Sequence, residues 1–180
     1  MSKLIIFVIE TKSSKYDSDG VYVKEVYQRF YSYNKYDTIF RFVYMDGKWN
    51  YNKKNVLNKI NGEIKKFLSV GNKDYHVVYI ADKDEYRTNQ QDEKYVRMLT
   101  QFCKEKGYKL VWMDKNIEDV FLGHSVEQNQ KIKEAARFKR DGLINHIPTK
   151  NLMDRECCRQ HCSNILCVLN LCFDEKNKNF

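Results

Sequence analysis

The chain has 180 residues and is basic, with 32 Lys and Arg against 24 Asp and Glu and a formal net charge of +8 at pH 7. That length predicts one domain with a real hydrophobic core, and one Pro and seven Gly argue against a disordered or fibrous chain. No apolar run approaches the ~20 residues that span a bilayer, and the first apolar run lacks a small-residue cleavage site. The sequence therefore predicts a cytoplasmic protein without membrane contact, whose six cysteines are thiols or ligands and not disulfides.

The excess of lysine and arginine suits a polyanionic partner, and nucleic acid, either DNA or RNA, is the polyanion that we consider first. Lys, Asn and Tyr are all abundant, and an AT-rich coding sequence would enrich the same three residue types. The composition alone leaves both explanations open.

Apolar runs separated by amphipathic stretches predict strands that alternate with helices. Residues 76–82 are typical of a central strand buried on both faces, because Val, Tyr and Ile favour extended backbone and do not alternate with polar residues here. We expect a sheet that includes residues 3–10, 38–45, 76–82 and 109–113. Apolar side chains at helical spacing predict helices over residues 21–33, 52–69 and 89–106.

Further helices are expected in the last third of the chain. Asn116 is the predicted N-cap of a helix that starts at residue 117. Residues 126–140 predict a basic helix, and residues 152–173, with five of the six cysteines, predict an apolar one.

This order of elements predicts an α/β fold in three layers, a mostly parallel sheet flanked by helices and joined by right-handed crossovers. Residues 1–125 are expected to form the α/β domain. Residues 126–180 are expected to form a helical C-terminal extension packed on the same domain.

Acidic residues follow three of the predicted strands. Glu10 ends the first strand, Asp82 and Asp84 end the third, and Glu118 lies just past the fourth. The carboxyl ends of parallel strands share one edge, and residues i and i+2 of an extended backbone point the same way. One hard cation such as Mg²⁺, which keeps waters and needs only one or two protein carboxylates, would fit between Asp82 and Asp84. The alternative is that these acids only cap the turns that follow the strands.

An apolar strand that ends in Glu10, followed later by a strand that ends in Asp82-Lys83-Asp84, resembles the TOPRIM fold of type IA topoisomerases, bacterial primases and the overcoming-lysogenization-defect (OLD) nucleases. The segment Asn116-Ile117-Glu118-Asp119-Val120-Phe121-Leu122 and the sequence Asp82-Lys83-Asp84-Glu85 are similar to motifs of RloB-like proteins, a TOPRIM-related family found with phage-defence loci. The resemblance covers roughly residues 3–124. It implies a Rossmann-like TOPRIM fold with Glu10 as the catalytic glutamate, and with Asp82, Asp84 and Glu118 as acids that hold Mg²⁺ or Mn²⁺.

The function that this resemblance implies is a metal-dependent, phosphodiester-cleaving nuclease, acting on DNA or RNA in phage defence, with a protein partner in a defence complex. Glu10 would be its general acid or base. A non-catalytic TOPRIM-like module that binds nucleic acid or a protein stays open as the alternative, and a small-molecule phosphotransferase or phosphatase is a third interpretation.

Basic residues in two places are candidates for contact with nucleic acid. Lys12 and Lys15 follow Glu10 closely and would flank the proposed site. The predicted basic helix carries Lys131, Lys133, Arg137, Lys139 and Arg140. Such a cluster binds phosphates without regard to sequence, but it is also typical of a solvated helix face.

The C-terminal cysteines, together with His161, suggest zinc as one interpretation. Structural zinc sites usually take their ligands from two short loops, whereas these residues lie within one predicted apolar helix, where free Cys behaves as a small buried hydrophobe. We therefore favour packing in the core over zinc.

Overall fold

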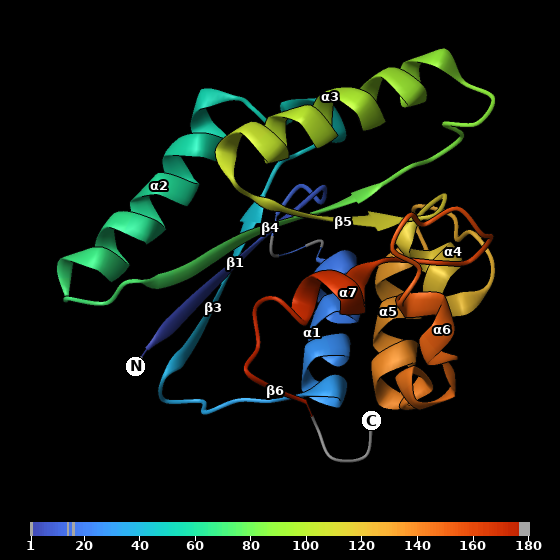
Figure 1. The fold of residues 1–180 in the computed structure, drawn as a ribbon. Coiled ribbons are helices and arrows are strands. Elements are labelled where there is room, and N and C mark those ends of the chain that lie inside the picture. The colour runs from blue at the N-terminus through green and yellow to red at the C-terminus, as the bar shows by residue number, and fades with distance from the viewer. Residues whose placement is uncertain (1, 14, 16, 177–180) are drawn as a thin grey trace.

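Within the residues that the computed structural model describes, 2–13, 15 and 17–176, four parallel strands form the central sheet, in the order β3-β1-β4-β5 (Figure 1). The strands are β1 Lys3–Ile9, β3 Thr38–Tyr44, β4 Asp74–Asp82 and β5 Lys109–Met113. The predicted α/β class with a parallel sheet flanked by helices is therefore confirmed. None of the described helices combines the length and apolar character that crossing a membrane requires.

Strand β1 is one of the two interior strands of the sheet, and all seven of its residues are buried. It pairs in parallel with β3 on one side and with β4 on the other. Its side chains alternate between two hydrophobic clusters, with Ile5, Phe7 and Ile9 in one and Leu4, Ile6 and Val8 in the other. This alternation decides on which face of the sheet the residue after the strand will lie.

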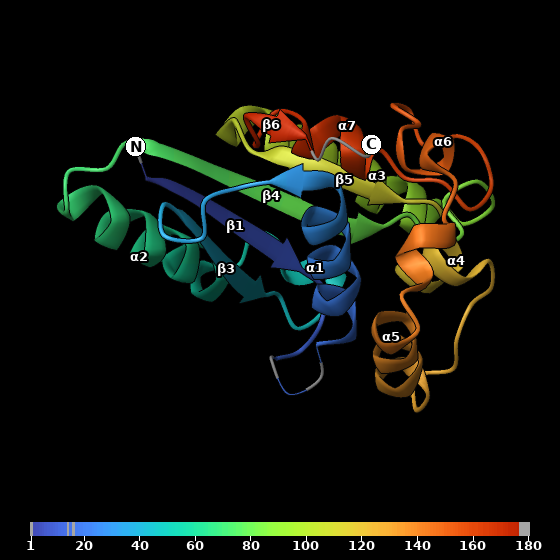
Figure 2. The ribbon, with the colours of Figure 1, turned by 90° about the horizontal axis from the view of Figure 1, so that it is seen from below.

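Helices cover both faces of the sheet, as Figures 1 and 2 show. Helix α1 (Ser18–Phe30) lies on one face, and α2 (Lys54–Ser69) and α3 (Gln90–Lys106) lie on the other. The division follows from the strand order: the first crossover runs from β1 to β3, and the next two run the opposite way to β4 and β5. Right-handed crossovers that run in opposite directions must place their helices on opposite faces.

Helix α1 begins with Asp17 as its N-cap, whose carboxylate accepts a hydrogen bond of 2.7 Å from the backbone N–H of Gly20. It ends at Phe30, earlier than the predicted end at residue 33, because the next two residues are extended. They form β2 (Tyr31–Ser32), which pairs antiparallel with β6 (Glu175–Lys176).

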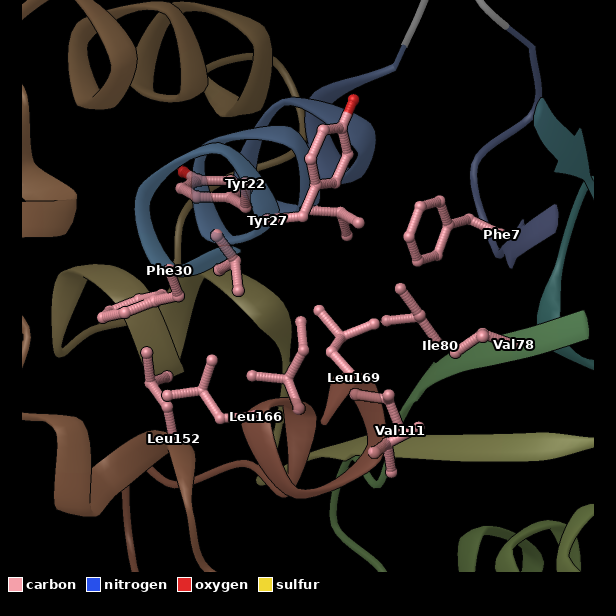
Figure 3. Close-up of a cluster of buried hydrophobic side chains, with 14 of the residues drawn as sticks. Phe7, Tyr22, Tyr27, Phe30, Val78, Ile80, Val111, Leu152, Leu166 and Leu169 are labelled. Carbon is pink, nitrogen blue, oxygen red and sulfur yellow. The ribbon is translucent and has the colours of Figure 1, made fainter. Parts of the chain in front are cut away.

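The remaining elements gather beyond β5 and on the α1 face, apart from η2, which follows β3. They are η2 Lys48–Asn50, α4 Ile117–Leu122, α5 Lys131–Arg140, η3 Leu143–His146, α6 Thr149–Leu152 and α7 Ile165–Leu169. The basic helix thus starts at residue 131, not at 126. Residues of α5, α6 and α7 share one hydrophobic cluster with α1 and the sheet. Figure 3 shows side chains of α1, α7 and the sheet converging in this cluster. Residues 177–180 of the predicted extension lie outside the described residues.

The predicted helix over residues 152–173 is wrong. Helix α6 ends at Leu152, α7 spans only Ile165–Leu169, and the residues between them form turns. Cys157 and His161 have φ angles of +50° and +53°, in the left-handed region that interrupts an α-helix. Both lie in the stretch of chain that turns back to reach the outer edge of β5.

Asn164 closes that edge of the sheet. Its amide oxygen accepts a hydrogen bond of 2.8 Å from the backbone N–H of Trp112, and its amide nitrogen donates one of 3.2 Å to the carbonyl of Leu110. The hydroxyl of Ser163 donates to the carbonyl of Trp112 at 2.7 Å. These side chains occupy the place that a further strand would fill.

We expect Asn164→Ala to lower the free energy of unfolding by about 1–3 kcal/mol, because the buried N–H of Trp112 would lose its acceptor. Urea unfolding monitored by circular dichroism measures the change. Asn145→Ala is the control: the exposed Asn145 amide donates to the carbonyl of Gly142, and its removal should cost less than about 0.5 kcal/mol. Equal effects of the two substitutions would show that Asn164 does not hold the edge.

Candidate active site at the carboxyl edge of the sheet

The strand order places a crevice outside the carboxyl ends of β1 and β4. These are the first and third strands of the sheet along the chain, and they are neighbours at the point where the direction of the crossovers reverses. Such a switch point is where open α/β sheets bind their ligands. A pocket of about 490 Å³ lies there, lined by Glu10, Thr11, Lys12, Ser18, Asp19, Asp46, Gly47, Asp82, Gln128, Lys131 and Ile132.

Glu10 directly follows β1 and continues the alternation of Leu4, Ile6 and Val8, so it lies on the α3 side. Its Oε1 accepts hydrogen bonds from the Tyr95 hydroxyl at 3.1 Å and from the backbone N–H of Asp82 at 3.2 Å. Burial raises the pKa of Glu10 to about 7, helped by the charges of Asp84 and Asp19 and opposed by both hydrogen bonds. A carboxyl group that titrates near neutrality can act as general acid or base.

Asp82 is the last residue of β4 and approaches the edge from the other face. Val78 and Ile80, which share its parity, belong to the cluster on the α1 side. Burial raises the pKa of Asp82 well above its ordinary value, and the charges of Glu10 and Asp19 raise it further. The two strand-end acids are therefore adjacent but directed into different layers.

Asp84 does not share the face of Asp82, so the expectation of one extended segment carrying both is wrong. Strand β4 ends at Asp82, and Asp84 has a φ of +48°. Its carboxylate instead forms an ion pair with Lys48 at 2.6 Å. The turn after the strand thus separates the two acids that the sequence places two residues apart.

Glu118 is fully buried and paired with a basic residue of the predicted nucleic-acid helix. Asn116 caps α4 as predicted, accepting a hydrogen bond of 2.9 Å from the backbone N–H of Asp119. The Oε2 atom of Glu118 accepts a hydrogen bond of 3.1 Å from Lys131, and its Oε1 atom has no hydrogen-bond partner. A buried carboxylate oxygen without a partner is costly, which makes it a candidate ligand.

Asp19 is an acid of the site that the sequence analysis missed. It lies in the first turn of α1, lines the pocket and accepts a hydrogen bond of 3.2 Å from the Thr11 hydroxyl. Burial raises the pKa of Asp19 to about 6, and the charge of Glu118 adds to the rise while Lys131 opposes it. An acid in a first helical turn is ordinary, so only its place at the start of the first helix after β1 hinted at a role.

The predicted basic residues divide between the pocket and the outer surface. Lys12 and Lys131 line the pocket, while Lys15 lies exposed on the same loop as Lys12. The other basic residues of α5 are exposed, and two of them pair locally, Arg137 with Glu134 and Arg140 with Asp141. Lys133 and Lys139 are also exposed on α5, so four basic side chains lie on its outer surface.

The donor set suits a hard divalent ion without forming a closed cage. Among the described residues, no three His, Cys, Asp or Glu side chains stand close enough to hold one metal ion. Mg²⁺ needs only one or two protein carboxylates, and the unpartnered oxygen of Glu118 beside the mutually repelling Asp19 and Asp82 meets that need. The fit is to an ion held by carboxylates and waters.

The C-terminal cysteines do not assemble a comparable site within the described chain. Cys157 and Cys162 are buried with their sulfur atoms 3.4 Å apart, and Cys172 is buried in the hydrophobic cluster on the α1 face. Cys158 is exposed. Three of these cysteines thus pack in the hydrophobic core, whereas Cys158 does not.

Comparisons with protein-family models, with curated proteins and with solved structures gave no match for this chain.

We expect the stability of the metal-free protein to depend on pH because of these acids. The pKa values of Asp19 and Glu10 are raised to about 6 and about 7 in the folded chain, so the folded state binds protons more tightly than the unfolded state. The protonated acids therefore give their full contribution to stability below pH ~4, and this contribution is lost as the pH rises through the two raised pKa values. Stability in EDTA should fall between pH 4 and 8. Asp19→Asn should reduce that fall by about 1–3 kcal/mol, as measured by urea unfolding at several pH values. A free energy of unfolding that does not change with pH in this range would show that the pKa values of these acids are not raised in the folded protein.

Proposed function

We propose that the chain is a Mg²⁺- or Mn²⁺-dependent nuclease of TOPRIM type that cleaves phosphodiester bonds in DNA or RNA. The observation that supports this proposal most directly is the gathering of Glu10, Asp19 and Asp82 around a pocket at the switch point of the sheet that also holds lysines. The buried Glu118 lies close enough to raise the pKa of Asp19 and of Asp82. Acids that repel one another suit a cation, and the lysines suit phosphate.

The residues divide into three roles. Asp82 and Glu118 would hold the metal, with the charge of Asp19 beside them, and the metal when bound would supply a Lewis acid and lower the pKa of coordinated water. Glu10, on the other face of the sheet, would exchange the proton through a carboxyl group whose pKa lies near neutrality. Lys12 and Lys131 would contact the phosphate oxygens.

The TOPRIM-like identity of the fold and a setting in phage defence, with a protein partner, belong to the same proposal. They rest on the resemblance of Glu10, Asp82-Lys83-Asp84 and the Asn116–Leu122 segment to those families. A non-catalytic module that binds nucleic acid is favoured by one contact, since the Lys131 ammonium already neutralises Glu118 at 3.1 Å.

The deciding experiment combines melting curves with cleavage assays. The protein would be melted in EDTA and with Mg²⁺ or Mn²⁺, and incubated with single- and double-stranded DNA and RNA in the same buffers. We expect a higher melting temperature and cleavage with the divalent ions only. If the melting temperature does not change with the ions and no substrate is cleaved, the non-catalytic binding module is the remaining function.

The exposed basic residues of α5 predict binding that depends steeply on salt. Replacing them with Gln should reduce the slope of log K against log salt concentration by about 0.7–0.9 for each phosphate that the variant no longer neutralises. Fluorescence anisotropy with a labelled oligonucleotide measures the slope. The variant changes Lys133, Arg137, Lys139 and Arg140.

The control removes the same number of charges from α2, which lies in the opposite layer of the molecule (Figure 1). It changes Lys54, Lys59, Lys65 and Lys66, which are all exposed. This variant has the same net charge, so it should keep the wild-type slope if α5 is the contact surface. Equal slopes for both variants would show that net charge alone attracts the nucleic acid.

A further inference from the structure

An ion cluster on the α3 side of the carboxyl edge is not used by the roles assigned above. The Lys48 ammonium lies 2.6 Å from Asp84 Oδ2 and 2.5 Å from Asp92 Oδ1, and 5.4 Å from the centre of the Tyr95 ring. The side chains of Lys48 and Asp92 are only 22% and 12% exposed. Their attraction is therefore screened by water less than that of a surface pair.

The backbone fixes Lys48 at this position. Asp46 and Gly47 have φ angles of +57° and +108°, and this turn directs the chain into η2. The turn is fastened to the chain just after β1, because the backbone N–H of Gly47 donates to the carbonyl of Glu10 at 3.0 Å. The ammonium is thus tied to the same segment that carries the candidate catalytic acid.

Both acids are held in place as well. The second oxygen of Asp92 accepts a hydrogen bond of 3.2 Å from the backbone N–H of Glu85, and Asp84 has the left-handed backbone already described. Each acid is directed toward the ammonium by backbone geometry, which leaves Lys48 between two fixed carboxylates. Burial lowers the pKa of Lys48, but Asp84 and Asp92 raise it more, so the side chain stays charged.

We propose that the Lys48 ammonium is a built-in cation that occupies the α3 side of the acidic edge, so that the protein binds one divalent ion and not two. The ion would lie on the α1 side with Asp82 and Glu118. Asp84 would act as a partner of Lys48 and not as a metal ligand. The number of ions rests on the proposed function, whereas the role of Lys48 rests on its own contacts.

The test counts Mn²⁺ ions bound per chain by electron paramagnetic resonance titration of free Mn²⁺. We expect one ion for the wild type and two for Lys48→Met, because that change leaves Asp84 and Asp92 without a positive charge between them. Lys115→Met is the matched control, since it removes an exposed pair with Glu85 at the same edge. It should bind one ion.

Two ions on the wild type, or the same count for the wild type and a folded Lys48→Met, would overturn the inference. A wild type that binds none while Lys48→Met binds one would support the role of Lys48 and refute the metal dependence of the proposed function. If Lys48→Met does not fold, Asp84→Asn decides. An Mn²⁺ dissociation constant that rises less than fivefold supports the inference, and a larger increase overturns it.

Discussion

Asp82→Asn should abolish the stabilisation of the protein by Mg²⁺ or Mn²⁺. An ion that binds only the folded state stabilises it by about 2.7 kcal/mol when its concentration is a hundredfold above the dissociation constant. Asp82 lies where burial and the charges of Glu10, Asp19, Asp84 and Glu118 all oppose its ionisation, so an ion placed there relieves the repulsion between these acids. Melting curves with and without the ion measure the effect.

The same substitution should raise the stability of the metal-free protein, because a neutral amide removes the repulsion. Asp74→Asn is the control. It lies at the other end of the same strand, where Asp74 pairs with Lys3 at 3.5 Å, and it should leave the response to the ions intact. If Asp82→Asn kept the full response, or if neither variant responded, the ion would not be bound at the carboxyl edge.

Glu10→Gln should lower the cleavage rate by about 10²- to 10⁴-fold, the usual contribution of a general acid or base. Much of the thermal response to Mn²⁺ should remain, because Glu10 approaches the edge from the face opposite to Asp82. Single-turnover cleavage measured beside the melting curves separates the two effects. Loss of both together would assign Glu10 to metal binding instead of proton transfer.

Tyr95→Phe gives a second test of Glu10 as the group that transfers the proton. The Tyr95 hydroxyl donates to Glu10 and lowers its pKa, so its removal should shift the Glu10 limb of the pH–rate profile to higher pH while the ring still fills the core. A profile that does not move would mean that Glu10 does not set the rate.

The sequence was sufficient for the parts of the molecule that depend on local periodicity. The four strands, the helices between them and the N-cap at Asn116 follow from apolar spacing and capping preferences, and the parallel order follows from the alternation of the elements. The meeting of Glu10 and Asp82 at one edge also followed, because parallel strands must bring their carboxyl ends together.

The sequence was insufficient where a single backbone angle or a distant contact decides the outcome. The left-handed backbone conformation of Asp84 separates its side chain from that of Asp82, and an Asp-x-Asp pattern does not predict this φ angle. Asp19 joins the site only because α1 folds back beside the end of β1. The apolar stretch over residues 152–173 has helical character, but the hydrogen bonds of Ser163 and Asn164 to β5 outweigh it.

The closing of β5 by Asn164 has a consequence for how the chain is made. The backbone N–H of Trp112 binds the side chain of Asn164, which lies 52 residues further along the chain. During synthesis on the ribosome, β5 is therefore made before the residue that closes its outer edge. Open strand edges are templates for pairing with other chains, and contacts this distant in sequence slow folding. In the interval between the two events the nascent protein presents the open edge of β5 to other chains.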